Sequence, residues 1–258
     1  MIALNHIIHR IFFRIVYWYI STIDRKGEVL FMNYGYSDAN FHIPLHPSDE
    51  KNRYSIQLYH IVASEVDLEG KNILEVGSGR GGGLNYICNM FNPISATGVD
   101  LSEKAIQFCK TRYADQRIRF FVSDAEHLIF NDSNFDVVIN IESSHGYPHI
   151  DKFLEEVYRV LRPGGFFIFA DFRPKADLKS LDQLFVKAKL SFMNKKIITQ
   201  QVLQSLDLMK SLRQEQIRNM IPGILRGISR RFVALEGTMM YNNFLTHEFE
   251  YVLYTLKK

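Results

Sequence analysis

A run of glycines between an apolar segment and a helical pattern is the first feature of this chain that suggests chemistry. Residues 74–83 read LEVGSGRGGG. Glycines at such a turn bend the chain sharply and let backbone N–H groups approach a ligand without a Cβ in the way. Gly77, Gly79 and Gly82 fit the spacing Gly-x-Gly-x-x-Gly, which cradles the pyrophosphate of a dinucleotide. The run therefore predicts a ligand-binding loop at the start of a helix.

The same run also fits a second kind of site. Glu75 precedes Gly77, Gly79 and Gly81, which is the Glu-x-Gly-x-Gly-x-Gly spacing of methyltransferase loops. A carboxylate at position 75 repels a pyrophosphate but attracts a ligand that carries a cationic amino acid. By itself the loop leaves both sites open, and a tight turn without a ligand is a third interpretation.

Two further carboxylates follow the next two β-rich runs. Asp100 ends the second run, where a carboxylate can accept hydrogen bonds from both ribose hydroxyls. Asp124 follows the third run, where it can accept from the amino group of an adenine. Open α/β sheets bind ligands in the crevice at the carboxyl ends of their strands. With Glu75, these acids predict a site for a nucleoside that carries a cationic amino acid.

A parallel sheet must bring these residues together. β-rich runs and helical patterns alternate from residue 71 onward. The predicted strands are 72–76, 95–100, 118–122, 135–141 and 166–171, and the predicted helices are 83–91, 103–113 and 152–161. This rhythm predicts βαβ units with helices on both faces of the sheet. With two closing strands at 232–236 and 248–256, the fold class is α/β, a doubly wound, mostly parallel, seven-stranded sheet.

The rhythm breaks after Pro174. Residues 175–231 carry helical patterns, such as 181–190 and 199–212, and no convincing strand. They hold 12 Lys and Arg against 4 Asp and Glu, a local charge of +8, whereas the whole chain has a net charge of +3. We therefore expect one domain in three parts. These are an N-terminal helical cap (1–66), an α/β core (67–174 and 232–258) and an inserted helical lid (175–231) for the substrate.

Composition excludes several other classes of protein. The chain has 258 residues, of which 47% are hydrophobic and 23% charged, as in an ordinary globular protein. Its two cysteines, Cys88 and Cys109, are too few for a disulfide framework or a four-ligand metal site. The small net charge does not predict nucleic acid binding. We expect no metal and no nucleic acid partner, and the sequence carries no indication of an oligomeric state.

The first twenty residues are apolar but do not predict a membrane span. His6, His9, Arg10 and Arg14 interrupt them, and a spanning helix needs about 18 or more apolar residues in a row. No signal peptide is predicted either, because the usual basic start and small-residue cleavage site are missing. One helical face is shared by Leu4, Ile8, Ile11, Ile15 and Trp18. We expect a cytoplasmic protein in which this face packs on its own domain; the alternative is peripheral contact with the inner membrane face.

Four motifs together resemble a Rossmann-like S-adenosylmethionine-dependent methyltransferase. They are residues 74–83, 98–102 (GVDLS), 123–126 (SDAE) and 159–165 (RVLRPGG). Residues 31–36 (FMNYGY), 48–53 (SDEKNR), 142–149 (ESSHGYPH) and 171–174 (DFRP) extend the likeness. They resemble the phthiotriol/phenolphthiotriol dimycocerosate methyltransferases, which methylate a hydroxyl on a long-chain polyketide-derived lipid. The resemblance implies S-adenosyl-L-methionine as cofactor and a hydrophobic, lipid-like or polyketide-like acceptor, and it is weaker in the lid.

The resemblance also implies roles for individual positions. Glu75, Gly77, Ser78, Gly79 and Gly81 would hold the methionine part of the cofactor, Asp100 and Leu101 the ribose and adenine, and Asp124 and Ala125 the adenine edge, while Asn140 would line the crevice. Tyr34 and Tyr36 lie in a segment similar to the one that folds over the sulfonium in related small-molecule methyltransferases. The alternative interpretation of both tyrosines is aromatic core.

Methyl transfer to an alcohol is helped by a base within hydrogen-bond reach, because a free hydroxyl is a poor nucleophile at neutral pH. His145 follows the fourth predicted strand beside the crevice and is the candidate base. Asp171 ends the fifth strand, where it can orient the imidazole and stabilise its charged form. Related O-methyltransferases of sugars and natural products use a histidine and an aspartate at corresponding places. Glu142 is a candidate second partner, and His149 is expected to precede the next helix.

Other functions fit the same motifs. Within enzymes, the alternative is C- or N-methylation of a quinone, sterol or polyketide. A non-catalytic cofactor-binding protein, a cyclase-type protein and a nicotinamide oxidoreductase are alternatives of other classes. The lid either presents solvated helical faces or gates an apolar pocket lined by Leu184, Phe185, Phe192, Leu206 and Met209.

Overall fold

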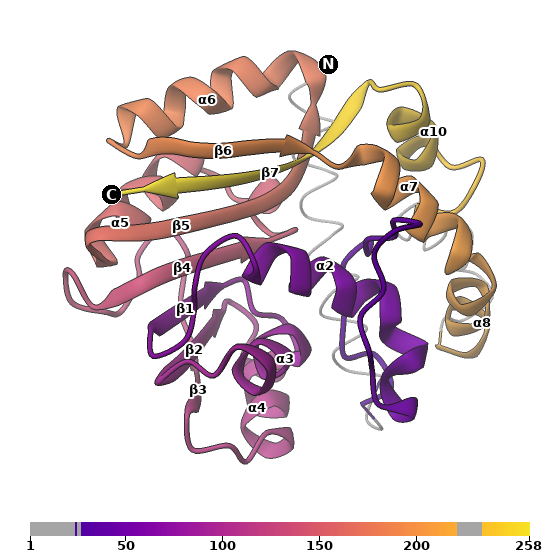
Figure 1. Ribbon diagram of the computed structural model, residues 1–258, viewed down its shortest axis with the longest axis horizontal. Helices are drawn as coiled ribbons and strands as arrows, with labels where there is room; N and C mark the ends of the chain where they lie inside the picture. Colours follow the sequence, from indigo (N-terminus) through magenta and orange to yellow (C-terminus); the bar gives the residue numbers. More distant parts are fainter. Residues whose placement is uncertain (1–23, 25–26, 221–233) are drawn as a thin grey trace.

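The computed structural model describes residues 24, 27–220 and 234–258. Its centre is a seven-stranded sheet with the order β3-β2-β1-β4-β5-β7-β6 (Figure 1). The strands are β1 (Asn72–Val76), β2 (Ser95–Asp100), β3 (Ile118–Val122), β4 (Phe135–Ile141), β5 (Leu161–Pro174), β6 (Ser191–Ile197) and β7 (Phe249–Lys257). β1 to β5 pair in parallel, whereas β7 is antiparallel to both β5 and β6. The predicted doubly wound, mostly parallel sheet is confirmed.

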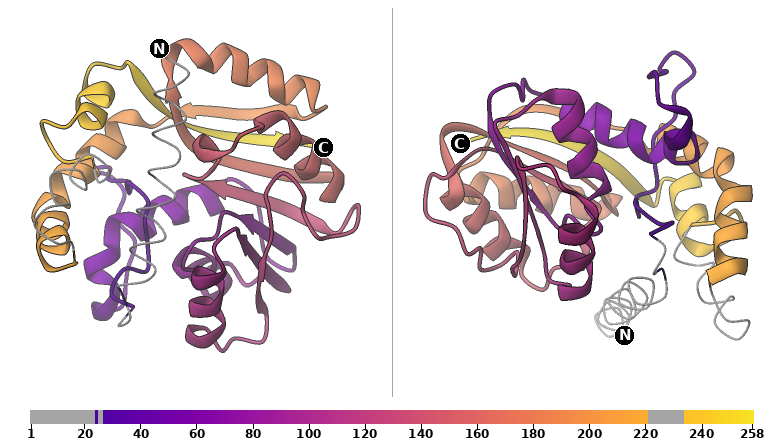
Figure 2. Two further views of the ribbon diagram at one scale, coloured as in Figure 1. Left: turned by 180° about the vertical axis from the view of Figure 1, so that it is seen from behind. Right: turned by 90° about the horizontal axis from the view of Figure 1, so that it is seen from below.

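Helices cover both faces of the sheet, because side chains alternate between the faces along each strand. On β1, Ile73 belongs to one buried core and its neighbour Leu74 to the other. The first face carries α2 (Arg53–Ala63), α3 (Gly82–Phe91) and α4 (Glu103–Arg112), and the second carries α5 (Ile150–Val160) and α6 (Leu178–Lys187) (Figure 2). Parallel strands between two helical layers need apolar side chains on both faces. The near-continuous apolar runs of β4 and β5 meet that need.

The predicted lid contains a strand, contrary to expectation. All seven residues of β6 are exposed, and the strand pairs along β7 with a register shift between Phe192 and Asn194. An edge strand without a buried side lacks the apolar alternation from which strands are predicted. The strand predicted at 232–236 is wrong in its described part, because residues 234–236 form a turn before α10 (Met239–Leu245). The seventh strand therefore comes from inside the lid.

The remaining lid helices are α7 (Thr199–Leu208) and α8 (Lys210–Met220). They lie with α10 beyond the end of the sheet at which β6 finishes (Figure 1). Short 3-10 turns complete the described elements at η1 (Pro47–Asn52), η2 (Ser144–Gly146) and η3 (Lys175–Asp177). The lid helices thus stand at the same end as the carboxyl termini of the parallel strands.

The single apolar pocket predicted for the lid is wrong. Phe185 is buried in the core beneath α5 and α6, whereas Leu206 belongs to the core on the opposite face of the sheet. The sheet itself separates them.

Several of the lid's cations are paired with acids. Lys195 contacts Asp182 at 2.8 Å, and Lys196 contacts Glu65, two residues beyond the end of α2. Lys210 pairs with Glu236. Such exposed pairs are worth about 0–1 kcal/mol each, but they reduce the positive charge that the lid presents to solvent.

The described residues contain no helix that is both long and apolar enough to cross a membrane. The amphipathic helix predicted at residues 4–18 lies outside the described part of the chain.

Candidate active site

The glycine loop between β1 and α3 requires glycine at Gly77. This residue has a φ of 79°, in the left-handed region, and a Cβ there would lie 2.0 Å from Oγ of Ser143. The N–H groups of Gly77 and Ser78 donate to the carbonyl of Val99, at 2.8 and 2.9 Å. These bonds hold the loop against β2, so that α3 begins at the carboxyl edge of the sheet.

Four buried side-chain atoms among the described residues have no hydrogen-bond partner, and all lie in or beside this loop. One is Nε of Arg80, and the other three are oxygens, namely Oε2 of Glu75, Oγ of Ser78 and Oδ1 of Asn140. Their other groups are bonded: Glu75 Oε1 accepts from the Tyr59 hydroxyl at 2.8 Å, and Asn140 Nδ2 donates to the Val76 carbonyl at 2.9 Å. Buried polar atoms are normally paired, so these oxygens mark a place for a ligand with donor groups. The ammonium of a methionine moiety is such a ligand, and the residues therefore fit the expected cofactor.

Burial also makes the protonation state of Glu75 sensitive to a cation bound beside it. Loss of solvent raises its pKa to about 8, against the hydrogen bond from Tyr59, which lowers it, and the charge of Asp100 adds to the rise. A positive charge bound beside the carboxyl would stabilise its ionised form.

Asp100 ends β2, and its carboxylate is fixed next to the glycine loop. Oδ2 accepts from the N–H of Gly79 and Oδ1 from the N–H of Ser102, both at 2.9 Å. A carboxylate oxygen can accept more than one hydrogen bond, and the binding of ribose hydroxyls by Asp100 stays a prediction. Leu101 follows with 53% of its surface exposed, as a residue that packs on an adenine must be. The structure thus brings Asp100 to the same edge as Glu75.

The turn after β3 carries Asp124 and Ala125. Asp124 is exposed and accepts from the N–H of Glu126 at 2.9 Å, while Ala125 is buried. Glu126 in turn accepts from the N–H of His149 at 2.7 Å, which holds this turn to the start of α5. His149 precedes α5 as predicted. Adenine recognition by Asp124 and Ala125 stays a prediction.

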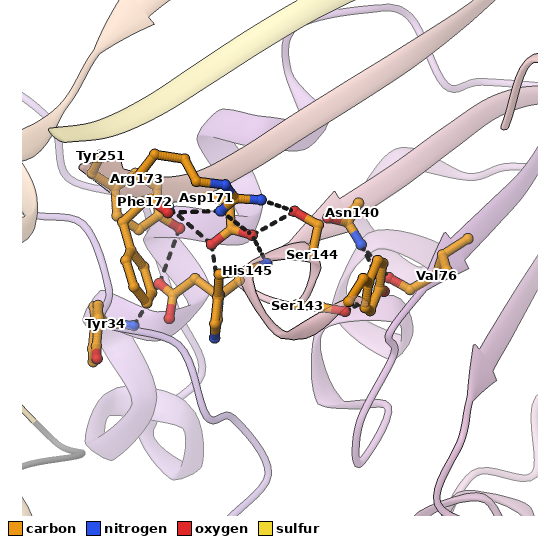
Figure 3. A network of polar contacts seen from close by, with 12 residues as sticks. Tyr34, Val76, Asn140, Ser143, Ser144, His145, Asp171, Phe172, Arg173 and Tyr251 are labelled. Atoms are coloured by element: carbon orange, nitrogen blue, oxygen red, sulfur yellow. Dashed lines mark hydrogen bonds and ion pairs between the residues drawn. The ribbon is translucent and has the colours of Figure 1, made fainter. Parts of the chain in front are cut away.

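His145 and Asp171, predicted as a pair, are in contact (Figure 3). Nδ1 of His145 lies 2.8 Å from Oδ1 of Asp171, and the backbone N–H of His145 donates to Oδ2 at 2.9 Å. The imidazole stacks on Phe172 with ring centroids 4.4 Å apart, and 19% of the His145 side chain is exposed. Because a carboxylate only accepts, Nδ1 carries the proton and Nε2, on the side away from Asp171, is the acceptor. A base on this ring would act through Nε2.

Asp171 is fully buried yet keeps its charge. Burial alone would raise its pKa, but the charges of Arg173 and His145 and the hydrogen bonds from His145 and Ser144 hold the pKa well below its ordinary value. Arg173 approaches Oδ2 at 3.1 Å, and Oγ of Ser144 donates to the same oxygen at 2.6 Å. The imidazole is therefore oriented by an ionised carboxylate.

Glu142 follows β4 with a left-handed φ of 45°. Its Oε1 accepts from the N–H of Tyr34 at 2.8 Å and from the hydroxyl of Tyr251 at 2.9 Å. Burial raises the pKa of Glu142 to about 8; the N–H of Tyr34 lowers it and the charge of Asp171 raises it. These contacts tie an N-terminal segment to the sheet, and a direct catalytic role for Glu142 stays a prediction.

The two candidate tyrosines lie in different surroundings. Tyr34 is buried, with its ring 5.5 Å from that of Phe172 and 5.7 Å from that of Phe244. Tyr36 is half-buried, and its ring meets Phe41. Phe172 thus links Tyr34 to His145, whereas the structure turns Tyr36 toward α2 and its neighbours.

Several polar residues of this region were not predicted as site residues. Ser143, Tyr147 and Arg173 lie within motifs that carried the family resemblance, so proximity in sequence could have found them. Tyr147 closes over the loop, since its hydroxyl contacts Ser143 and accepts from Asn140 at 3.1 Å. Tyr251 and Arg213 lie far away in the chain and carried no sequence signal.

Within the described residues, no three His, Cys, Asp or Glu side chains gather to hold a metal ion.

Comparison with known proteins gives a consistent family. The sequence profile described as "Methyltransferase domain" matches residues 74–169. The chain is 42% identical over 214 residues to a protein of Mycolicibacterium smegmatis named fatty-acid O-methyltransferase, covering 83% of this chain and 78% of that one. It is 38% identical over 245 residues to the phthiotriol/phenolphthiotriol dimycocerosates methyltransferase of Mycobacterium tuberculosis, covering 94% and 91%.

The fold is also shared with a solved structure, that of geranyl diphosphate C-methyltransferase from Streptomyces coelicolor in complex with Mg2+, geranyl diphosphate and S-adenosyl-L-homocysteine. The TM-score is 0.67 at 18% identity, over 93% of this chain and 97% of that one. The family profile and these two relatives, which are matched over most of their length, agree on one chemistry. The chain belongs to the family of S-adenosylmethionine-dependent methyltransferases that includes these two relatives.

Proposed function

We propose that this enzyme transfers a methyl group to a hydroxyl on a lipid-like or polyketide-like acceptor, with His145 as general base. The observation that carries the proposal is the contact between Nδ1 of His145 and the buried, ionised Asp171 at 2.8 Å. The names of the two relatives, one acting on fatty acids and one on phthiotriol lipids, support a lipid acceptor.

The cofactor supplies an activated methyl group when it is bound, and the protein supplies position and proton removal. Glu75, Ser78 and Asn140 would hold its amino acid part, and Asp100 its ribose. Nε2 of His145 would accept the proton of the acceptor hydroxyl as its oxygen takes the methyl group, with the sulfur–methyl bond broken and S-adenosylhomocysteine released. The resulting imidazolium would be stabilised by Asp171, whose charge is already fixed by Arg173.

The polar surroundings favour a hydroxyl over a carboxylate as acceptor. A carboxylate is already ionised at neutral pH, needs no base and binds best beside an uncompensated cation. In the part of the chain that the structure describes, two buried guanidinium groups near the site contact acids: Arg173 contacts Asp171 at 3.1 Å and Arg80 contacts Asp24 at 3.2 Å. Arg213 lies near Glu142, whose pKa it lowers. These guanidinium groups are therefore poorly suited to binding a carboxylate acceptor, whereas His145 is well placed to act as a base on a hydroxyl.

The aromatic side chains beside His145 suit an apolar acceptor. Phe172, Tyr34 and Phe244 form one packed group at the end of the sheet. We propose that the acceptor approaches Nε2 along this group, with α7, α8 and α10 as the lid side of the site.

Product analysis tests the proposal. The purified enzyme would be incubated with methyl-labelled S-adenosylmethionine and chain-matched lipids that end in a secondary alcohol or in a carboxylic acid. We expect a labelled methyl ether from the alcohol by mass spectrometry. Labelled ester from the acid alone, or label on carbon or nitrogen of another acceptor, would contradict the proposed reaction.

A further inference from the structure

A short segment, residues 33–37, crosses from the sheet to the lid and is called the strap here. It belongs to no helix or strand, so its position depends on contacts with other elements. The N–H of Tyr34 donates to Glu142 at 2.8 Å, and the carbonyl of Tyr34 accepts from Oγ of Ser205 on α7 at 2.6 Å. The strap is therefore held from both sides.

The far end of the strap is also fastened. Tyr36 donates its N–H to the carbonyl of Tyr54 at 2.9 Å, and its own carbonyl accepts from Nε2 of Gln57 at 2.9 Å. The N–H of Ser37 donates to the carbonyl of Gln201 at 3.1 Å. These partners lie on α2 and α7, so the strap joins the N-terminal region to the lid.

Arg213 of α8 reaches the start of the strap. Its guanidinium donates to the carbonyl of Asn33 at 3.0 Å and lies 5.7 Å from the centre of the Tyr34 ring. Burial lowers the pKa of Arg213, while Tyr34 and Glu142 raise it. A guanidinium keeps its charge in proteins, and Glu142 and the strap carbonyl of Asn33 are among the groups that stabilise this buried cation.

One peptide unit connects these observations. The carbonyl of Asn33 and the N–H of Tyr34 belong to the same peptide bond, which is planar and places them on opposite sides. Arg213 from the lid holds the carbonyl, and Glu142 from the sheet holds the N–H. Arg213 and Glu142, which are distant in sequence, thus form hydrogen bonds with the same peptide unit.

We propose that Arg213 and Glu142 form a latch on the peptide between Asn33 and Tyr34, and that Arg213 is a positioning residue for methyl transfer. The latch holds the Tyr34 ring against Phe172, the residue on which His145 stacks. Closing the strap in this way fixes the acceptor side of the site and limits access of water. The inference depends on the proposed function at one point: the assignment of the Tyr34 and Phe172 side of the site to the acceptor.

Hydrogen exchange of the strap tests the latch without any acceptor. Amide exchange would be followed in peptides that cover residues 31–37, in Arg213→Met, in Glu142→Gln and in the double variant. Loss of a hydrogen bond to a charged group should speed exchange in the strap about tenfold or more, with β1 and β4 unchanged. Arg218→Met, an exposed position on the same helix, is the control and should leave the strap unchanged.

The double variant distinguishes a latch from two separate structural effects. If both side chains act through one peptide, the double variant should exchange no faster than the more affected single variant. Independent contributions would instead multiply. The double variant removes the carboxyl of Glu142 together with the cation near it, so it keeps the test usable where Arg213→Met alone fails to fold.

Catalysis gives the second readout. Arg213→Met should lower kcat about tenfold or more with the Kd for S-adenosylhomocysteine within about twofold, and Arg213→Lys should recover part of the rate. Unchanged strap exchange together with unchanged kcat in a folded Arg213→Met variant would overturn the latch. Loss of methyl ether product in the wild type would instead contradict the proposed function, and the exchange result would stand independently.

Discussion

His145 is the residue on which the proposed reaction depends most. Its proton-accepting nitrogen points away from Asp171, and its ring is fixed on one edge by that carboxylate and on one face by Phe172. The imidazole is therefore oriented before the substrate binds, and this prior orientation contributes much of the rate enhancement that a catalytic base gives.

Replacing this base gives a direct prediction. His145→Gln should lower kcat about 100- to 10,000-fold, because proton removal would pass to water. The affinity for S-adenosylhomocysteine, measured by calorimetry, should be unchanged. His149→Gln is the matched control, since His149 pairs with Glu126 and is not part of the His145–Asp171 pair. A fully active His145→Gln variant would remove the support for general-base catalysis.

Glu75 gives a prediction about pH. Its pKa rises from the ordinary 4.5 to about 8 in the folded protein, so its contribution to stability is lost as pH increases from about 4.5 to 8 and is constant above that. Glu75→Gln removes this loss. The variant should match the wild type near pH 5 and exceed its Tm increasingly up to pH 8, without cofactor.

The same substitution should weaken cofactor binding about tenfold or more, because a neutral amide replaces a carboxylate beside the ammonium. Thermal melts across pH and binding calorimetry would check the two effects. A melting difference that shrinks as pH rises would show that the sign of this argument is wrong.

At the scale of elements, the connections between strands and helices place the site. The loop from β1 to α3, the turn after β2 and the segment after β4 all leave the same edge of the sheet. Parallel strands make this possible, since all their carboxyl ends lie on one side.

The loop conformation can be tested with two glycines of similar φ. Gly77 and Gly70 have φ values of 79° and 68°, but a Cβ meets Ser143 at Gly77 and nothing within 4 Å at Gly70. Gly70→Ala should cost about 1–2 kcal/mol from the backbone alone. Gly77→Ala should cost more and abolish cofactor binding, as measured by chemical denaturation and calorimetry. Equal losses at both positions would mean that contact with Ser143 is unimportant.

At the scale of the whole molecule, the site joins parts of the chain that share no local pattern. Tyr34 lies 108 residues before Glu142, and Asn33 lies 180 residues before Arg213. A cofactor that binds only the folded protein should therefore stabilise the whole fold.

Ligand-induced stabilisation also separates the two interpretations of the glycine loop. S-adenosylhomocysteine at 100 times its Kd should add about 2.7 kcal/mol, which raises Tm by roughly 5–10 °C in a chain of this size. NAD at the same concentration should leave Tm unchanged. A shift with NAD and none with S-adenosylhomocysteine would contradict the family's cofactor for this chain.

The amino-acid sequence alone was enough to predict the central sheet and the chemistry at its edge. The first four predicted strands have the bounds of β1 to β4, because buried parallel strands are recognised from local apolar composition. Gly77, Asp100 and His145 were found for a similar reason: each lies at or shortly after the carboxyl end of a strand, so its place along the chain also predicts its place in the fold.

The residues that hold these groups in place could be identified only from tertiary contacts. β6 is exposed along its whole length, and its existence depends on pairing with β7. Arg213 and Tyr251 reach the site from the lid and the last strand, and the unpaired oxygens of Glu75 and Asn140 are visible only when their neighbours are known. Such contacts join residues far apart in the chain, and no local period or motif predicts which distant residues will meet.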